Sequence, residues 1–205
     1  DRLQRLLAGG ALRSLNSILP PQIAVRSLFA VRDDFHPRFS CLAREYEYLI
    51  WNAEVRSVLY ADRALWVRQA LPVSQIHQAL QALLGEHDFA SFTRAEYRAE
   101  NTTRYLDKIA LLRDDREGEL LRFQIRGNAF LHNMIRILVG TVIAMAQNKI
   151  PLDMERLLIS PDRNAAGPTA RPHGLCLLQA YYPPAFASGT PLAALENYPV
   201  FRRGK

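Results

Sequence analysis

Two stretches of the chain place chemically capable side chains at a fixed spacing, and the first lies within residues 120–149. His132 and Arg136 are four residues apart and would share one face of a helix. Arg136 would lie near the start of this otherwise apolar helix, where the helix dipole favours a carboxylate over a guanidinium. An arginine at such a place usually has a fixed anionic partner, a carboxylate or a phosphate. The alternative is that both side chains are ordinary surface residues.

The second stretch, residues 44–51, begins Arg-Glu-Tyr-Glu-Tyr. In a strand, Arg44, Tyr46, Tyr48 and Ile50 share one face, because successive side chains alternate between the two faces. A tyrosine ring can stack on a base and offer a hydroxyl at its edge. An arginine and a tyrosine presented together at the start of a strand therefore favour a contact with nucleic acid. The alternative is a tyrosine-rich sheet face that packs on helices.

The hydrophobic pattern indicates which elements position these residues. Apolar and polar residues alternate over 121–126, which predicts a strand with one buried face. The spacing then becomes helical over 130–143, with Asn128 as the expected N-cap and Pro151 closing the far end.

The remaining pattern predicts the fold class. Helices are expected over 12–19, 72–84 (N-cap Ser74, stop Gly85) and 153–159, and strands over 23–31, 44–51, 104–112 and 175–182, with 104–112 and 121–126 as a hairpin. This order predicts an α+β fold, an antiparallel sheet with helices packed on one face. The open face of the sheet would be available for a ligand.

Composition narrows the class of partner. The chain has 205 residues and 49% hydrophobic residues, which argues against disorder. Its net charge of +6 and pI of about 9.6 suit a polyanion, nucleic acid first. Cys41 and Cys176 form no Cys-x-x-Cys motif, which favours a reducing compartment. The histidines show no metal-ligand spacing. With no signal peptide and no apolar run long enough to span a bilayer, a cytoplasmic protein without a metal or a membrane partner is expected.

Several motifs together resemble the TruA family of tRNA pseudouridine synthases. Their order and spacing are specific, and they cover the chain from about Leu12 to Tyr182. The motifs are LNSILPP (15–21), DFHPRFS (34–40), REYEY (44–48), LGEHDF (84–89), NAFLHNMIR (128–136), AGPTA (166–170) and HGL (173–175). The resemblance implies a pseudouridine synthase-like fold with a ferredoxin-like subdomain.

The resemblance also implies an activity. The family isomerises uridine to pseudouridine in the anticodon stem-loop of tRNA, at positions 38 to 40, without a metal or an organic cofactor. It acts as a homodimer with a positively charged groove between the subunits, and the target base leaves the stack to react. The partners implied are therefore tRNA and a second copy of the chain. The alternative function is a non-catalytic RNA-binding or dimerisation fragment.

The resemblance implies roles for five residues of this chain. Tyr46 matches the tyrosine that stacks on the target uracil and is thought to help remove the carbon 5 proton. Arg136 matches the arginine that pairs with the catalytic aspartate. Arg44 is expected to contact phosphate. Asn128 and His132 fall in the active-site helix segment as substrate-binding residues, with no chemical step assigned.

The family nucleophile is an aspartate in an Arg-Thr-Asp-Ala-Gly-Val-His-Ala motif, expected upstream of this chain. The chain thus looks like a fragment of the enzyme, or an enzyme whose first part is not recorded. Two positions depart from the family pattern, because Ile137 stands where an asparagine is common and Thr93 stands where an arginine is usual, with Arg94 one residue later.

The chain is expected to comprise three parts. Residues 1–40 are a remnant of an N-terminal subdomain with a linker, 41–182 a C-terminal catalytic and RNA-binding subdomain, and 183–205 a tail rich in Pro, Ala and Gly with a basic end.

Overall fold

The expected hairpin forms the centre of the sheet in a computed structural model, which describes residues 10–97, 100–187, 190, 192–196 and 198. The chain divides into two units. One comprises residues 1–41 and 181–197, and the other comprises residues 42–180 and 198–205. All five residues expected to act lie in the second unit. The functional division at residues 40 and 182 stays a prediction.

The sheet of the second unit confirms the α+β class. In spatial order its strands are β3 (Gly85–Asp88), β4 (Thr103–Arg113), β5 (Leu120–Gly127), β1 (Ala43–Trp51) and β6 (Leu175–Tyr182), whose last two residues belong to the first unit. The pairs β3–β4, β4–β5 and β1–β5 are antiparallel, whereas the short strand β2 (Leu65–Trp66) is parallel to β1. The sheet is therefore antiparallel at its centre, with a short parallel addition.

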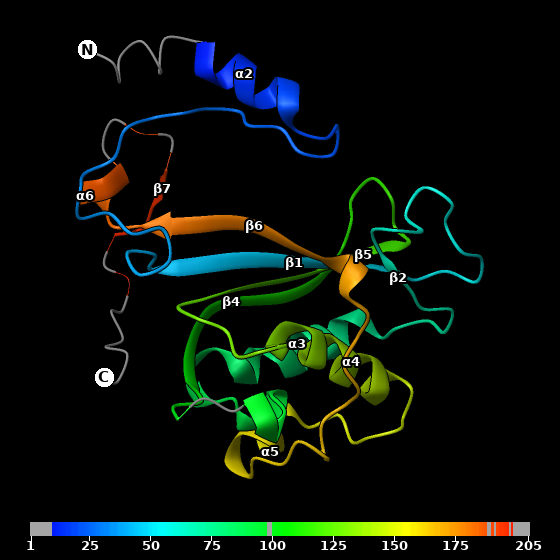
Figure 1. Ribbon diagram of the computed structural model, residues 1–205. Helices are drawn as coiled ribbons and strands as arrows, with labels where there is room; N and C mark the ends of the chain where they lie inside the picture. Colours follow the sequence, from blue (N-terminus) through cyan, green and yellow to red (C-terminus); the bar gives the residue numbers. More distant parts are fainter. Residues whose placement is uncertain (1–9, 98–99, 188–189, 191, 197, 199–205) are drawn as a thin grey trace. The chain divides into compact units, whose positions relative to one another are not determined.

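Three helices lie on the same side of this sheet (Figure 1). They are α3 (Val73–Leu80), which continues as the 3-10 turn η2 (Gln81–Leu83), α4 (Met134–Ala146) and α5 (Met154–Ile159). Short 3-10 turns at η3 (Ala90–Phe92), η4 (Ala95–Tyr97) and η5 (Pro172–Gly174) complete the unit. The core between helices and sheet includes Tyr48, Leu111, Phe123, Ile76 and Leu138, all fully or almost fully buried. Helices packed on one face were expected from the sequence.

Helix α4 begins later and ends earlier than the sequence predicts. Its N-cap is Asn133, in the left-handed conformation with φ 59°, and its C-cap is Gln147 rather than a residue next to Pro151. Asn128 does not cap the helix, because its side-chain oxygen accepts hydrogen bonds from the N–H groups of Tyr105 (3.0 Å) and Ala129 (2.8 Å). The left-handed turn at Asn133 separates an irregular segment, 128–133, from the helix.

Two further expectations in the second unit are corrected. Helix α3 has Pro72 rather than Ser74 at its N-cap position, without a side-chain cap bond. Gly85, expected only to stop this helix, opens strand β3, and no strand was expected there. The residues Gly-Glu-His-Asp of β3 lack apolar alternation, and pairing with β4 makes them a strand.

The first unit lacks the strand expected over 23–31, although helix α2 (Ala11–Ile18) is present. The carboxamide of Asn16 accepts from the Val25 N–H and donates to the Val25 carbonyl, both at 2.8 Å. The main-chain groups of Val25 thus form hydrogen bonds with a side chain instead of with a neighbouring strand. The unit also holds α6 (Pro184–Ala187) and β7 (Ala193–Ala194), which pairs in parallel with Tyr181 and Tyr182.

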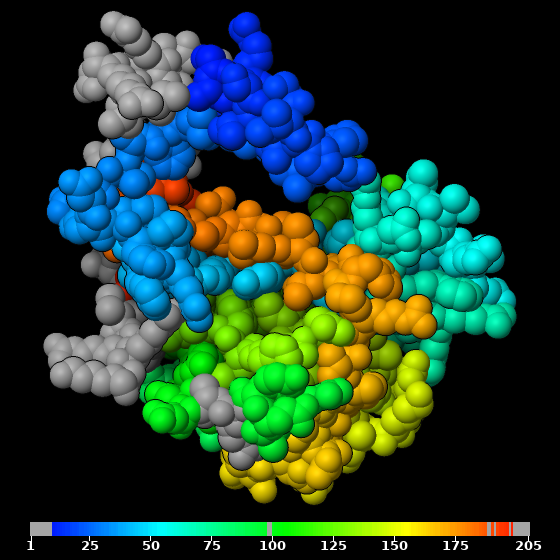
Figure 2. Space-filling view, in the orientation of Figure 1, coloured from blue at the N-terminus to red at the C-terminus, as the bar shows by residue number. Residues whose placement is uncertain are grey.

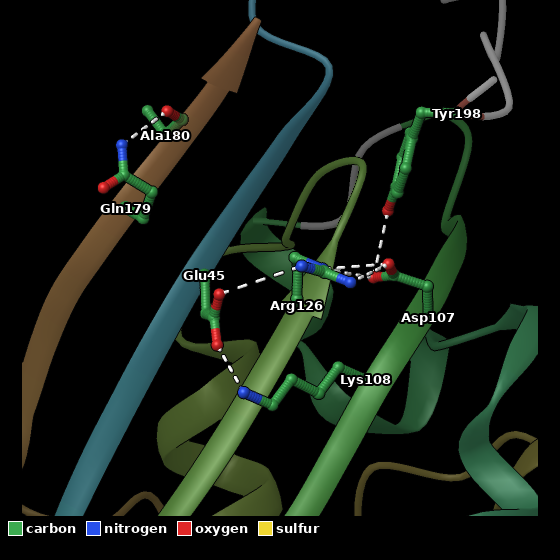
Figure 3. A network of polar contacts seen from close by, with 7 residues as sticks. All are labelled: Glu45, Asp107, Lys108, Arg126, Gln179, Ala180 and Tyr198. Atoms are coloured by element: carbon green, nitrogen blue, oxygen red, sulfur yellow. Dashed lines mark hydrogen bonds and ion pairs between the residues drawn. The ribbon is translucent and has the colours of Figure 1, made fainter. Parts of the chain in front are cut away.

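The sheet face away from the helices carries paired charges (Figure 3). Lys108 donates to Glu45 at 2.6 Å, and Arg126 pairs with Asp107 at 2.7 Å and with the second oxygen of Glu45 at 4.0 Å. Tyr198, in the predicted tail, donates to Asp107 at 3.4 Å, whereas the basic end at 202–205 lies outside the described residues.

This charged face was expected to be available for a ligand, but the candidate residues do not lie on it. Strand alternation puts Arg44 and Tyr46 on the opposite face from Glu45, toward the helices.

Strand β6 is exposed over residues 176–179, and its atoms appear in orange in the space-filling view (Figure 2). Leu177 and Leu178 keep 52% and 46% of their surface. In the part of the chain that the structure describes, no helix has the length and apolar character needed to cross a membrane.

Candidate functional site

Tyr46 lies on β1 with its ring half-buried against the segment that precedes helix α4. Its ring meets Phe130 edge-on, with 5.2 Å between centroids and 85° between planes. Edge-to-face contacts of this kind orient an aromatic ring as well as bury it. Phe130 therefore orients the Tyr46 ring, which remains partly accessible, as a residue that stacks on a base must be.

Arg44, two residues earlier on the same face, reaches the same segment. Its Nη1 donates to the main-chain carbonyl of Asn128 at 3.4 Å. The main chain of Asn128 in turn donates to the Tyr105 carbonyl at 3.1 Å. Since the Asn128 side-chain oxygen already binds two main-chain N–H groups, this residue joins β4 to the segment 128–133. Its role as a substrate contact stays a prediction.

Arg136 lies in the first turn of α4 and is half-buried. Its Nε donates to the carbonyl of Ala170 at 2.7 Å, and its Nη1 donates to the side-chain oxygen of Asn133 at 2.9 Å. Both acceptors are neutral. Among the described residues, every ion pair involves a basic residue other than Arg136. The guanidinium is thus oriented by the protein while its charge is left for another anion.

His132 is exposed and lies outside the helix, so it does not share a helical face with Arg136. Its ring lies 4.2 Å from that of Tyr97, and its carbonyl accepts from the Thr93 hydroxyl at 3.4 Å. Thr93, which departs from the family pattern, therefore contacts the candidate segment directly. The neighbouring Arg94 instead pairs with exposed Glu96 at 3.5 Å.

The loop 166–174 carries two of the family-like motifs, but no role was expected for its residues. The loop supplies the Ala170 carbonyl to Arg136, and its Arg171 carbonyl accepts from the Tyr48 hydroxyl at 2.5 Å. Burial raises the pKa of Tyr48 to about 12, although the charges of Arg136 and Arg171 act in the opposite direction. In the sequence, the second tyrosine of the REYEY motif is the feature that could have predicted this contact.

The segment 128–136 brings the candidate residues together. It contacts Tyr46 through Phe130, Arg44 through Asn128, and the loop 166–174 through Arg136. The arrangement offers an aromatic ring for stacking and two guanidinium groups for anions, a combination suited to a nucleotide.

Two cavities lie elsewhere in the second unit. One, of about 740 Å³, is lined by residues including Trp66, Arg68 and Ile143, and the other, of about 400 Å³, by residues including Gln75, Met145 and Pro151. Neither includes a candidate residue. No cluster of three or more His, Cys, Asp or Glu that could hold a metal ion occurs within the described ranges.

Comparison with known proteins gives consistent matches. A family model described as tRNA pseudouridine synthase matches residues 79–183. A protein of Bordetella petrii named tRNA pseudouridine synthase A is 42% identical over 186 residues, which cover 90% of this chain and 68% of that protein. Proteins of the same name from Chromobacterium violaceum and Xanthomonas euvesicatoria are 40% and 42% identical, covering 86% and 80% of this chain but 66% and 63% of their own lengths. The chain thus spans about two thirds of the length of these relatives.

Proposed function

This chain belongs to the tRNA pseudouridine synthase family, and we propose that its second unit carries the tyrosine and the arginine of a site that isomerises uridine to pseudouridine in tRNA. One observation carries the proposal. The Arg136 guanidinium is fixed by two neutral acceptors, the Ala170 carbonyl and the Asn133 carboxamide, beside a segment that holds Tyr46 through Phe130. The Arg136 guanidinium is oriented, and no carboxylate among the residues that the structure describes neutralises its charge. It is therefore suited to hold an acidic nucleophile.

In the proposed reaction the bond between C1′ of the ribose and N1 of the base breaks, and a new bond forms between C1′ and C5. The C5 proton leaves, and N1 gains a proton. Arg136 keeps the carboxylate nucleophile ionised, because a neighbouring opposite charge favours the charged form. Tyr46 stacks on the uracil while the base turns, and its hydroxyl assists removal of the C5 proton. Arg44 contacts a phosphate of the flipped nucleotide, and Asn128 and His132 border the bound substrate.

The finer features are also proposals. Positions 38 to 40 of the anticodon arm are the proposed targets, and the active form is a homodimer that binds tRNA in a positively charged groove, in the cytoplasm. The net charge of +6 and the names of the relatives support tRNA as the partner.

Release of tritium from tRNA labelled at carbon 5 of uridine tests this function in the full-length protein. Tyr46→Phe and Arg136→Ala are expected to lower the rate by at least about 100-fold, the range for removing one group that acts in the transition state. Arg68→Ala is the matched control, because Arg68 is an exposed arginine paired with exposed Glu54 and should leave the rate unchanged. Unchanged rates in both test variants would contradict the assignment. Binding of tRNA without any isomerisation by the unsubstituted protein would favour the RNA-binding module instead.

A further inference from the structure

We propose that Tyr48 is a positioning residue for the reaction, because its hydroxyl fixes the loop 166–174 and, through Ala170, the orientation of Arg136. The inference rests on the proposed role of Arg136. Tyr48 does not itself contact substrate in this proposal, so it is distinct from Tyr46, the other tyrosine on the same strand face.

The first link joins β1 to the loop. Tyr48 is fully buried, and its hydroxyl donates to the Arg171 carbonyl at 2.5 Å. A buried tyrosine hydroxyl needs a partner, and here the partner is main chain rather than a side chain that could rotate away. The ring also meets Gly174, where a Cβ would lie 2.6 Å from Tyr48 Cε1 and 2.8 Å from the Leu49 carbonyl. Tyr48 thus holds the loop at two points, three residues apart.

The second link joins the loop to helix α4. Ala170, next to Arg171, accepts from the Arg136 Nε at 2.7 Å and donates its own N–H to the Arg136 carbonyl at 3.0 Å. At the other end of the loop, Gly167 donates to the Thr141 hydroxyl at 2.9 Å. The loop is therefore fixed to α4 at Gly167 and Ala170, and fixed to the sheet through Tyr48. A shift at Arg171 would displace the carbonyl that orients Arg136.

The hydroxyl remains a donor under all ordinary conditions. Burial raises the pKa of Tyr48 to about 12, so the group keeps its proton at neutral pH. The nearby guanidinium groups of Arg136 and Arg171 favour the phenolate, but burial has the larger effect and keeps the hydroxyl protonated.

The competing explanation is that Tyr48 only fills the core. Tyr48→Phe separates the two, because it keeps the ring that packs in the core and removes only the donor. Tyr182→Phe is the matched control, since the buried Tyr182 hydroxyl also donates to a main-chain carbonyl, that of Pro37 at 3.0 Å, but in the first unit. Both substitutions remove one hydrogen bond and should lower stability by similar amounts.

The test measures kcat and KM for tRNA, the melting temperature, and the NMR signal of the Arg136 Nε–H in the full-length protein. Tyr48→Phe is expected to lower kcat about tenfold with KM within about twofold, because displacement of a catalytic group acts mainly on the transition state. The Arg136 signal should shift and lose protection from exchange. Tyr182→Phe should change neither. Replacing Tyr48 by p-aminophenylalanine restores a donor and should restore both kcat and the signal.

Each result decides the proposal. Unchanged kcat and an unchanged Arg136 signal in Tyr48→Phe would overturn it, and so would a lower kcat with an unmoved signal. If Tyr48→Phe does not fold, p-fluorophenylalanine, which fills the hydroxyl's place but cannot donate, takes its place in the comparison. If the unsubstituted protein releases no tritium, the proposed function fails, and the NMR measurement alone decides whether Tyr48 positions Arg136.

Discussion

Arg136 and Ala170 are joined by two reciprocal hydrogen bonds. The Arg136 Nε donates to the Ala170 carbonyl at 2.7 Å, and the Ala170 N–H donates to the Arg136 carbonyl at 3.0 Å. Side chain and main chain of one helical residue are thus tied to a single residue of a loop 34 positions later. With Nη1 bound to Asn133, two of the three guanidinium nitrogens have protein acceptors, which fixes the plane of the group.

This geometry predicts that charge alone will not replace Arg136. Arg136→Lys keeps the positive charge but has no Nε–H and no planar fork, so it cannot satisfy the Ala170 and Asn133 oxygens together. We expect tritium release to fall at least about 100-fold, the loss typical of removing one oriented electrostatic group. Arg122→Lys is a suitable control, because Arg122 also binds two partners, Asp114 and Glu47. Near wild-type activity in Arg136→Lys would show that orientation is unimportant.

Gly140 should resist replacement even by alanine. It lies in α4, where alanine is a better helix former by about 1 kcal/mol. A Cβ there, however, would lie 1.7 Å from the Pro168 carbonyl oxygen, a main-chain atom of the loop that holds Arg136. We expect Gly140→Ala to lower the free energy of unfolding by about 2–3 kcal/mol, as overpacking does, measured by urea denaturation. Gly118→Ala, with open space around the Cβ, should change it by less than about 0.5 kcal/mol. Equal stabilities of the two variants would contradict this contact.

The sheet could be predicted from sequence where residues alternate clearly. Strand β5 was expected within one residue at each end, because its apolar residues alternate with Arg122, Gln124 and Arg126. The strand expected over 23–31 was wrong because a side chain, that of Asn16, binds the main chain there. The start of α4 was wrong because the left-handed turn at Asn133 follows apolar residues whose spacing already looks helical.

The sequence predicts residues of the site only where the type of the side chain indicates its function. Tyr46 and Arg136 stand out because of their chemistry and because their motifs resemble a known family, although their functional roles stay predictions. The contribution of Ala170 is a main-chain carbonyl, which any residue could supply, and that of Tyr48 depends on where its strand meets a loop 123 positions away. Such roles come from tertiary contacts that no local pattern records.

Arg44 should contribute to RNA affinity more than to chemistry. Its Nη1 donates to the Asn128 carbonyl at the long distance of 3.4 Å, and it lies two residues from Tyr46. We expect Arg44→Ala to weaken tRNA binding and to reduce the slope of log K against log salt by about one, the loss of one phosphate contact. Arg113→Ala, an exposed arginine whose Nη1 binds the Gly118 carbonyl in the hairpin turn, serves as the control. An unchanged salt slope in Arg44→Ala would exclude a phosphate contact there.

The raised pKa of Tyr48 predicts a loss of stability at alkaline pH. The unfolded chain releases this proton near pH 10, whereas the folded protein holds it until about pH 12. The folded state therefore binds more protons than the unfolded state in this window, so stability is complete below pH 10 and falls as the pH rises toward 12. The stabilisation that the Tyr48 hydroxyl loses by pH 11 is about 1 kcal/mol.

Tyr48→Phe has no such proton, so its free energy of unfolding should fall less steeply between pH 9.5 and 11.5, measured by urea denaturation at each pH. Parallel slopes for Tyr48→Phe and the unsubstituted protein would show that the Tyr48 hydroxyl ionises normally in the folded state.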